Sequence, residues 1–476
     1  MNTEDTTSTE ICFLTATEMA EHIRTKKLSA KEVMEAHLSK IEETNAALNA
    51  IVTLLPEQAM EAAARADEAI ARGNPLGPLH GLPVAHKDLA LTKGIRTTFG
   101  SPIYQNFVPD RDSLIVERLK KAGALTIGKT NTPEFGAGSQ TFNEVFGATL
   151  NPYNTEKTCG GSSGGAAVAL ACGMIPIADG SDFGGSLRNP ANFCNVVGFR
   201  SSPGRVPIWP GDDGWQSIAI HGPMARTVQD IALLMTALAG PDPRCPIALS
   251  EQGSLFAGTL DRDFRGTRIA WSADLGGLPV DPQVSKVLES QRKVFEEMGC
   301  RVELSDPDFS GAEEIFLAER GASFALKLAG DLKNHRDKIK DTVIYEIETG
   351  MQLTGAEIGQ AVLKRTELFH RMRDYMEDYE FLVLPVNQVP PFDVTKPYVE
   401  QINGVHLEKY TDWMKSCWYI SVTRLPAISV PCGFTDDGLP VGIQIVGRHQ
   451  DDMGVLQLAF AFEKATRFWK QKPPLA

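Results

Sequence analysis

The sequence lacks the patterns that usually mark a metal site or a disulfide framework. Its eight cysteines are scattered over positions 12, 159, 172, 194, 245, 300, 417 and 432, and no two form a C-x-x-C pair. The zinc-binding motif H-E-x-x-H does not occur either. We therefore expect reduced, mostly buried cysteines and neither a metal nor an organic cofactor.

An excess of basic residues and a long apolar run are also missing. The chain carries 60 acidic and 47 basic side chains, a net charge of −13, which disfavours nucleic acids and anionic membranes as partners. The longest apolar run, Ala166 to Ala178, is too short to span a bilayer and contains Gly173 and Pro176. Because the first residues, MNTEDTTSTE, do not resemble a secretory signal, we expect a cytoplasmic protein.

What is present suits one large globular domain, since 42% of the 476 residues are hydrophobic and 22% charged. Helical spacing of apolar residues predicts helices over 15–24, 29–44, 57–71 and 281–298, with Ser29 as an N-cap. Short apolar runs predict strands over 82–85, 123–130, 175–178, 268–272, 301–304, 381–385, 427–431 and 441–446. This alternation predicts an α/β/α sandwich with a large mixed β-sheet.

One lysine is placed as a general base requires. Lys87 follows the apolar residues Leu82 to Ala85, in the run GLPVAHKDL. A lysine can take a proton from a serine only when it is neutral, and burial lowers its pKa by disfavouring the ammonium form. Taken alone, Lys87 would be a charged residue at a strand end, so its role depends on neighbouring serines.

Two fragments rich in glycine and serine supply those serines. The run GGSSGG, residues 160–165, lacks the Lys-Ser/Thr of a phosphate-binding loop and leads straight into the apolar AAVALACGMIPIA, unlike a flexible linker. The fragment DFGGS ends at Ser186, and its glycines let several backbone N–H groups converge into an oxyanion hole. With Lys87, Ser162 and Ser186 make a candidate Ser-Ser-Lys triad.

Along most of its length the chain resembles the amidase signature family. The family pattern GGSSGG, then G-[ST]-D-x-G-G-S-[IL]-R-x-P, is met from Gly160 through Pro190, and Lys87 lies 75 positions before Ser162. Ser162 and Ser186 have the family's separation of 24 positions. Further similar blocks are TTFGS, GKTNTPEF, NPY, GPMARTVQD, PAISVPCGF and GLPVGIQIVG. The resemblance implies the same sandwich fold and amide hydrolysis, and homodimers are frequent in the family.

The resemblance also implies the role of each candidate residue. Ser186 would be the nucleophile, Ser162 the bridging serine after a cis peptide bond, and Lys87 the base. The expected oxyanion donors are four consecutive backbone N–H groups, those of Phe183, Gly184, Gly185 and Ser186. Asp182 and Arg188 are spaced so that they could pair beneath this loop and hold it.

A different hydrolase is a competing interpretation. Residues 161–165 also satisfy G-x-S-x-G, which would make Ser163 the nucleophile of an α/β-hydrolase. Candidate histidines follow downstream at His335, His370, His406 and His449. The polar residues 154–159, however, do not form the apolar strand that such a nucleophile elbow requires.

Within the single domain, 1–476, we expect N-terminal helices over 14–72, a catalytic core over 79–305 and a return to the core sheet over 413–476. Residues 310–412 read as helices plus an open segment rich in proline and asparagine, and are a candidate substrate lid. The expected pocket residues are aromatic or flank an aromatic: Phe135 and Gly136, which correspond to the family's acyl-side wall, Trp215, and Trp413 with its neighbours Tyr410, Trp418 and Tyr419.

The substrate is harder to infer. The family includes the A subunit of the aminoacyl-tRNA amidotransferase, which hydrolyses glutamine beside a partner subunit. Here Phe183 replaces that subunit's usual threonine and Arg424 its usual glycine, so a bulkier, more apolar pocket is expected. A stand-alone amidase for aryl or short-to-medium acyl amides is therefore preferred, with carbamates and esters as further small-molecule substrates.

Overall fold

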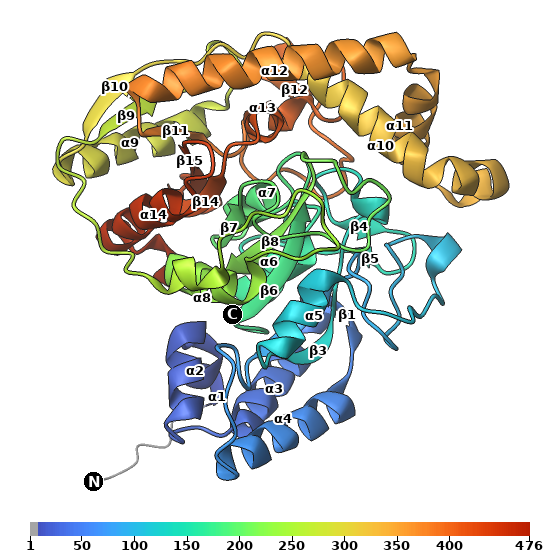
Figure 1. The fold of residues 1–476 in the computed structure, drawn as a ribbon, viewed down its shortest axis with the longest axis vertical. Coiled ribbons are helices and arrows are strands. Elements are labelled where there is room, and N and C mark those ends of the chain that lie inside the picture. Colours follow the sequence, from blue (N-terminus) through green and yellow to red (C-terminus); the bar gives the residue numbers. More distant parts are fainter. Residues whose placement is uncertain (1–7) are drawn as a thin grey trace.

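A large mixed β-sheet forms the centre of the molecule, in a computed structural model that describes residues 8–476 (Figure 1). Over those residues the sheet has 11 strands in the order β1-β3-β2-β6-β8-β7-β14-β15-β11-β9-β10. In that order their bounds are Ile51–Leu54, Leu125–Thr130, Pro83–Lys87, Ile177–Asp182, Ile220–Ala225, Val197–Arg200, Ala427–Phe434, Pro440–Gly447, Phe381–Pro385, Arg268–Trp271 and Arg301–Leu304. Strand β2 pairs in parallel with β3 and β6, whereas β14 and β15 are antiparallel.

Helices cover both faces of this sheet, which confirms the predicted α/β fold. The helices α1 to α7 span Ser8–Phe13, Ala16–Arg24, Ala30–Leu48, Pro56–Ala71, Leu114–Lys121, Gly164–Ala171 and Arg188–Phe193. The helices α8 to α14 span Val228–Leu238, Pro282–Glu297, Ala312–His335, Asp341–Gln352, Gly355–Asp378, Lys415–Thr423 and Asp452–Thr466. None of the described helices is both long and apolar enough to cross a membrane.

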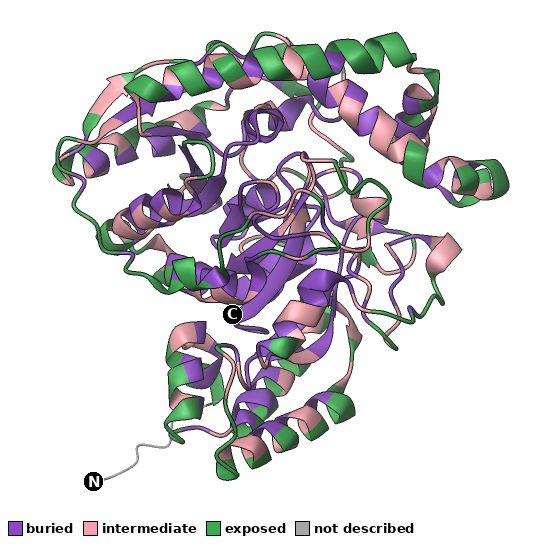
Figure 2. Ribbon diagram, viewed as in Figure 1, coloured by how far each residue is buried: buried purple, intermediate pink, exposed green. Residues whose placement is uncertain are grey.

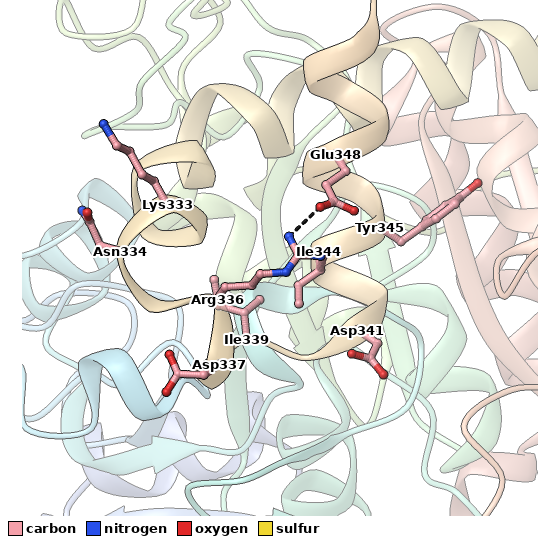
Figure 3. A pocket seen from close by; sticks show the side chains of 9 residues that line it. All are labelled: Lys333, Asn334, Arg336, Asp337, Ile339, Asp341, Ile344, Tyr345 and Glu348. Atoms are coloured by element: carbon pink, nitrogen blue, oxygen red, sulfur yellow. Dashed lines mark hydrogen bonds and ion pairs between the residues drawn. The ribbon is translucent and has the colours of Figure 1, made fainter.

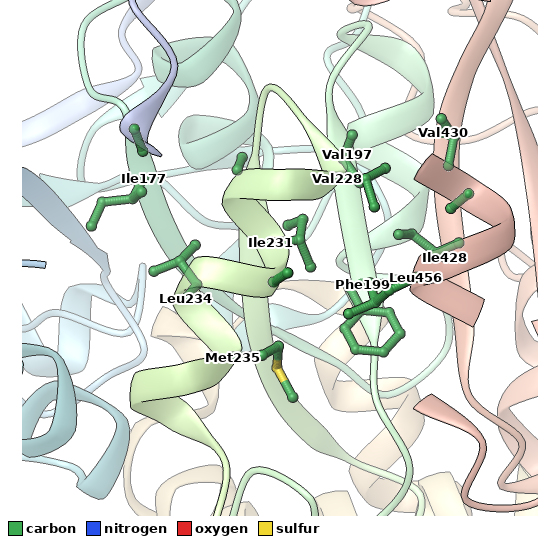
Figure 4. Close-up of a cluster of buried hydrophobic side chains, with 14 of the residues drawn as sticks. Ile177, Val197, Phe199, Val228, Ile231, Leu234, Met235, Ile428, Val430 and Leu456 are labelled. Carbon is green, nitrogen blue, oxygen red and sulfur yellow. The ribbon is translucent and has the colours of Figure 1, made fainter. Parts of the chain in front are cut away.

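The alternation of side chains along the strands creates two separate apolar cores. In β11, Phe381 and Val383 belong to the core beneath α8, α9 and α14, while Leu382 and Leu384 belong to the opposite core beneath α10, α12 and α13. Figure 4 shows part of the first core, where Ile231 and Met235 of α8 lie over strands β6 and β7. Strands in the middle of the sheet are buried on both faces (Figure 2), which explains why strands such as β11 and β14 are almost wholly apolar.

Most elements predicted from the sequence are confirmed, with shifts at their ends. Strands β10 and β11 have the predicted bounds, and Ser29 caps α3 by accepting from the Glu32 N–H. The strand expected from Ile175 begins at Ile177 and runs on to Asp182. Strand β1 lies in the stretch 14–72 that was expected to hold only helices, so that expectation is wrong there. Strands β7 and β8 were not anticipated either, because glycine and proline interrupt their apolar runs.

Residues 312–378 form three long helices at one end of the molecule (Figure 1). α10 and α11 cross at a glycine pair, Gly321 and Gly350, and a Cβ on Gly350 would lie only 1.9 Å from the Gly321 carbonyl oxygen. α10 also contacts the core, since Tyr104 donates a hydrogen bond to Asp331. This close crossing lets α10 and α11 form one unit against the core.

We predict that Gly350→Ala lowers the stability of the chain. The added methyl group forces α10 and α11 apart, which costs about 1–3 kcal/mol and lowers the apparent Tm in thermal unfolding followed by circular dichroism. Gly330→Ala is the matched control, because a Cβ at Gly330 in α10 meets nothing within 4 Å. We expect the control to be neutral or stabilising by up to about 1 kcal/mol. Equal effects of the two substitutions would contradict the role of the crossing.

Candidate active site

The amino group of Lys87 lies among three serine hydroxyls at the end of β2. Its Nζ is 2.8 Å from Ser162 Oγ, 2.9 Å from Ser163 Oγ and 3.1 Å from Ser181 Oγ. The side chain is only 1% exposed. Burial lowers the pKa of Lys87 to about 7, although Asp182 and Asp179 oppose the shift. The lysine can therefore exchange a proton with serine near neutral pH.

The serine run is held at the start of α6. The peptide bond between Gly161 and Ser162 is cis, and Ser163 is the residue before the first turn of the helix. The Ser163 N–H donates to the Ser186 carbonyl oxygen at 3.2 Å, which joins the two serine-bearing fragments. The structure thus brings Lys87, Ser162 and Ser186, which are far apart in the sequence, to one place.

A buried carboxylate anchors the loop that carries Ser186. Asp182 ends β6 and pairs with Arg188 at 2.9 Å and with Arg200 at 3.1 Å, and all three side chains are inaccessible. Burial alone raises the pKa of Asp182, but the two guanidinium groups outweigh it and hold the pKa well below its usual value. The predicted contact between Asp182 and Arg188 is confirmed, and Arg200 is a partner that the sequence did not suggest.

The same carboxylate organises the backbone of residues 183–187. The Gly185 N–H donates to Asp182 Oδ1 at 2.8 Å and the Leu187 N–H to Asp182 Oδ2 at 3.2 Å. Gly185 has a φ of 115° and lies against Cys417, so only glycine fits there. Of the four expected oxyanion donors, the Gly185 N–H is therefore already used by Asp182.

The expected acyl-side wall lies beside the serines. A Cβ on Gly136 would be 3.6 Å from Ser162 Oγ, so the backbone at Gly136 borders that hydroxyl. Phe135 has a left-handed φ of 50°, and its ring lies 6.1 Å from the ring of Tyr104. Lys340, just before α11, donates from its backbone N–H to Glu134, which ties this wall to the helical region.

The two tryptophans expected in the pocket have other environments. Trp413 is 1% exposed and stacks on Phe193 with the ring of Phe392 at its edge, so it lies in the core, and its contact with substrate stays a prediction. Trp215 is 75% exposed on a surface loop, and its contact with substrate stays a prediction. Trp418 stacks on Phe316, and both lie behind Gly184.

Helix α10 faces the Ser186 loop with aromatic rings and a paired arginine. Phe316 lies 6.0 Å from the half-buried ring of Phe183, and the Arg320 guanidinium lies 5.8 Å from the same ring. Arg320 is itself paired with Glu346 at 2.6 Å and bonded to Tyr410. The predicted lid region therefore contributes to the surroundings of the Ser186 loop.

Two polar residues of the site were not assigned a function from the sequence. Ser181 belongs to the G-[ST]-D part of the family pattern, and its place one residue before Asp182 could have indicated a contact with Lys87. His221 lies opposite Ser181 in the antiparallel pair of β6 and β8, a register that the sequence does not reveal. Burial lowers the pKa of His221 to about 4, so this histidine is neutral at pH 7.

One open hollow lies away from this chemistry. It has a volume of about 790 Å³ and is formed by the turn between α10 and α11, with Lys333, Arg336, Tyr345 and Glu348 around it (Figure 3). None of its lining residues is a candidate catalytic residue. The eight cysteines, as expected, are unpaired and buried.

Comparison with known proteins agrees with this geometry. The family model Amidase matches residues 32–456. The chain belongs to the amidase family. It is 36% identical to an acylamidase of Rhodococcus erythropolis over 98% of both chains. It is also 34% identical to the A subunit of the glutamyl-tRNA(Gln) amidotransferase of Geobacillus thermodenitrificans, over 97% of this chain and 99% of that one.

Solved structures of amidases share the fold across the whole chain. A bacterial aryl acylamidase of the amidase signature family superposes with a TM-score of 0.90 and 29% identity, covering 96% of this chain and 98% of that one. A 6-aminohexanoate cyclic dimer hydrolase gives a TM-score of 0.88 with 25% identity over 98% and 99% of the two chains. The protein is thus an amidase that acts on amide C–N bonds. Membership of this family rejects the α/β-hydrolase interpretation, and Ser163 contacts Lys87 rather than a histidine.

We predict that Asp182→Asn destabilises the chain strongly. The substitution leaves the buried guanidinium groups of Arg188 and Arg200 without a counter-charge, which costs about 3–5 kcal/mol in chemical denaturation. Because the folded state lowers the pKa of Asp182, this stabilisation is present above the unfolded pKa and is lost as the pH falls. The control is Asp263→Asn, which breaks an exposed pair with Arg265 and should change little. A small effect at Asp182 would refute its anchoring role.

Proposed function

We propose that this amidase hydrolyses small acyl and aryl amides through Ser186, Ser162 and Lys87. The observation that carries the proposal is the buried Lys87 amino group with its pKa near neutrality and its 2.8 Å hydrogen bond to Ser162. A neutral lysine accepts a proton only through a lone pair, and a serine hydroxyl beside it can pass that proton on. Similarity to an acylamidase and an aryl acylamidase supports the substrate class.

In the proposed mechanism, the Ser186 hydroxyl attacks the amide carbonyl carbon. Its proton moves to Ser162 while the Ser162 proton moves to neutral Lys87. The carbonyl oxygen becomes an oxyanion, for which the N–H groups of Phe183, Gly184 and Ser186 are the proposed donors. When the C–N bond breaks, the proton on Lys87 returns through Ser162 to the leaving amine. Water then cleaves the acyl-enzyme by the same relay, and hydroxylamine could replace water.

The surroundings of Phe183 favour an apolar acyl or aryl group as the substrate. The rings of Phe183, Phe316 and Trp418 are grouped on one side of the Ser186 loop. Arg320 nearby is already neutralised by Glu346, and Arg424 is held by Glu319 through two contacts of 2.7 Å. These cations are therefore already engaged by carboxylates of the chain, whereas a glutamine substrate needs charges to hold its α-amino and α-carboxylate groups.

A glutamine-hydrolysing subunit is the second candidate, because similarity to amidotransferase A subunits also covers nearly the whole chain. Carbamates and esters are proposed as further substrates, since the same attack on a carbonyl cleaves them. We also propose that residues 310–412 act as a lid over the substrate, that the protein is cytoplasmic, and that it forms a homodimer.

The triad is tested by single alanine substitutions. We expect Ser186→Ala, Ser162→Ala and Lys87→Ala each to reduce the release of nitroaniline from a short-chain acyl para-nitroanilide by about a thousandfold or more. Ser163→Ala is the matched control, because Ser163 contacts the same lysine and should retain much of the activity. Activity that survived Ser186→Ala would refute the mechanism. Ammonia release from glutamine, without nitroanilide cleavage, would support the second candidate.

The pH dependence of the reaction tests the role of Lys87. The lysine is a base only when neutral, and burial lowers its pKa to about 7. We therefore expect kcat/KM to be low at acidic pH and to rise as the pH increases through an apparent pKa near 7. The measurement is the pH profile of para-nitroanilide hydrolysis with protein stability checked at each pH. An activity that stays constant through this range, or falls with rising pH, would contradict the assignment.

A further inference from the structure

A second buried charged group lies directly beside Lys87. The parallel strands β2 and β6 pair Ala85 with Ala178, and this register brings His86 next to Asp179. His86 Nδ1 is 2.5 Å from Asp179 Oδ2, and the backbone N–H of Lys87 donates to Asp179 Oδ1 at 2.8 Å. Both side chains are at most 1% exposed. One carboxylate thus holds the backbone of Lys87 and the side chain of its neighbour.

We infer that Asp179 is a positioning residue that fixes Lys87 in the site, and that His86 orients the Asp179 carboxylate. The inference rests on the proposed function, in which Lys87 is the general base. The carboxylate acts through the lysine and does not touch the substrate.

Two hydrogen bonds hold the ring of His86. An ionised Asp179 only accepts, so a hydrogen lies on His86 Nδ1. On the other side of the ring, Nε2 is 3.1 Å from Thr126 Oγ1. The imidazole is thus fixed from both sides and in turn orients the Asp179 carboxylate.

The other charged groups on β6 and β3 around Lys87 are balanced by close partners. On β6, Asp182 is paired with Arg188 and Arg200. On β3, the buried Lys129 lies 3.9 Å from Asp88 and donates to the hydroxyls of two threonines, Thr92 and Thr97. Lys129 also acts on Asp179 through space and favours its ionised form.

On β8, His221 is the titratable group that faces Lys87, and burial keeps it neutral at pH 7. Asp179 is consequently the carboxylate near Lys87 whose hydrogen-bonded counter-group is a histidine rather than an arginine.

The direction of the effect follows from the charges. A negative Asp179 favours the ammonium form of Lys87, so it raises the pKa of the lysine, whereas burial lowers it. Removal of the Asp179 charge is therefore expected to lower the pKa of Lys87 further.

Asp179→Asn tests this inference, because the amide can accept from Lys87 and donate to His86 in its other tautomer. We expect the acidic limb of the kcat/KM profile to move to lower pH by about half a unit to one unit. The double variant His86→Leu/Asp179→Leu replaces the pair by apolar side chains and should move the limb in the same direction, with a lower kcat because the bond to the Lys87 N–H is lost. An unchanged or upward-shifted limb in the variants that fold would overturn the inference.

A control and a second readout distinguish an effect on Lys87 from a general effect of removing a buried charge. Asp452→Asn removes another buried carboxylate, which pairs with Arg205 at the start of α14, and should leave the acidic limb in place. The pKa of Lys87 can also be measured without turnover, from the NMR signal of ¹³Cε-lysine that is absent in Lys87→Met. If that pKa is lower in Asp179→Asn but neither the unsubstituted chain nor any variant cleaves the amide, the proposed function is refuted and the inference about Asp179 is supported. A Lys87 pKa that does not move would overturn it.

Discussion

The buried ionic group around Asp182 is the interaction on which the site depends. The carboxylate binds two guanidinium groups and two backbone N–H groups, so the turn after β6 has little freedom. Arg188 extends the network to the Cys417 carbonyl on α13 and to Gln444 on β15. The loop that carries Ser186 is thereby fixed to helix α13 and to strand β15. Burying these charges is costly, and only their mutual pairing makes it tolerable.

Lys87 is buried as well, but the burial of its charge is not fully compensated, and this gives the lysine its chemistry. Asp182 has cationic partners and stays ionised, whereas the partners of the Lys87 amino group are neutral hydroxyls. The two equally buried groups thus differ in their charge near neutral pH: the carboxylate stays ionised, whereas the lysine can become neutral. The reason is that hydroxyls do not offset the desolvation of an ammonium ion as a guanidinium group offsets that of a carboxylate. The contrast distinguishes Asp182, which stays charged, from Lys87, whose charge can change near neutral pH.

Helices α10 to α12 build a second boundary of the site on top of this core. They are linked to the core by specific polar contacts, among them Tyr104 with Asp331 and Lys340 with the backbone oxygen of Ala137. The aromatic contact between Phe316 and Phe183 brings α10 to the Ser186 loop.

Local patterns in the sequence were sufficient for the α/β fold, for helices α2, α3, α4 and α9 and for eight of the eleven strands of the described sheet, and they single out Lys87, Ser162 and Ser186, whose catalytic roles stay a prediction. Each of these rests on short-range information: apolar periodicity, a cap such as Ser29, or glycines beside serines. The sequence did not show that Trp413 lies in the core, because an aromatic residue has the same sequence signature in a core as in a binding site. Strands β7 and β8 were missed because their apolar pattern is broken by glycine and proline.

Strand register and long-range packing were decided only by the tertiary structure. The sequence by itself determined the chemistry that was available, namely a lysine after a buried strand and two glycine-flanked serines. It could not show that Ser181 and Ser163 both reach Lys87, that Arg200 shares Asp182, or that His86 meets Asp179, since these partners are separated by 18 to 94 positions in the chain. Such contacts depend on which strands lie side by side, and that arrangement is set by the burial of two whole sheet faces rather than by any local motif.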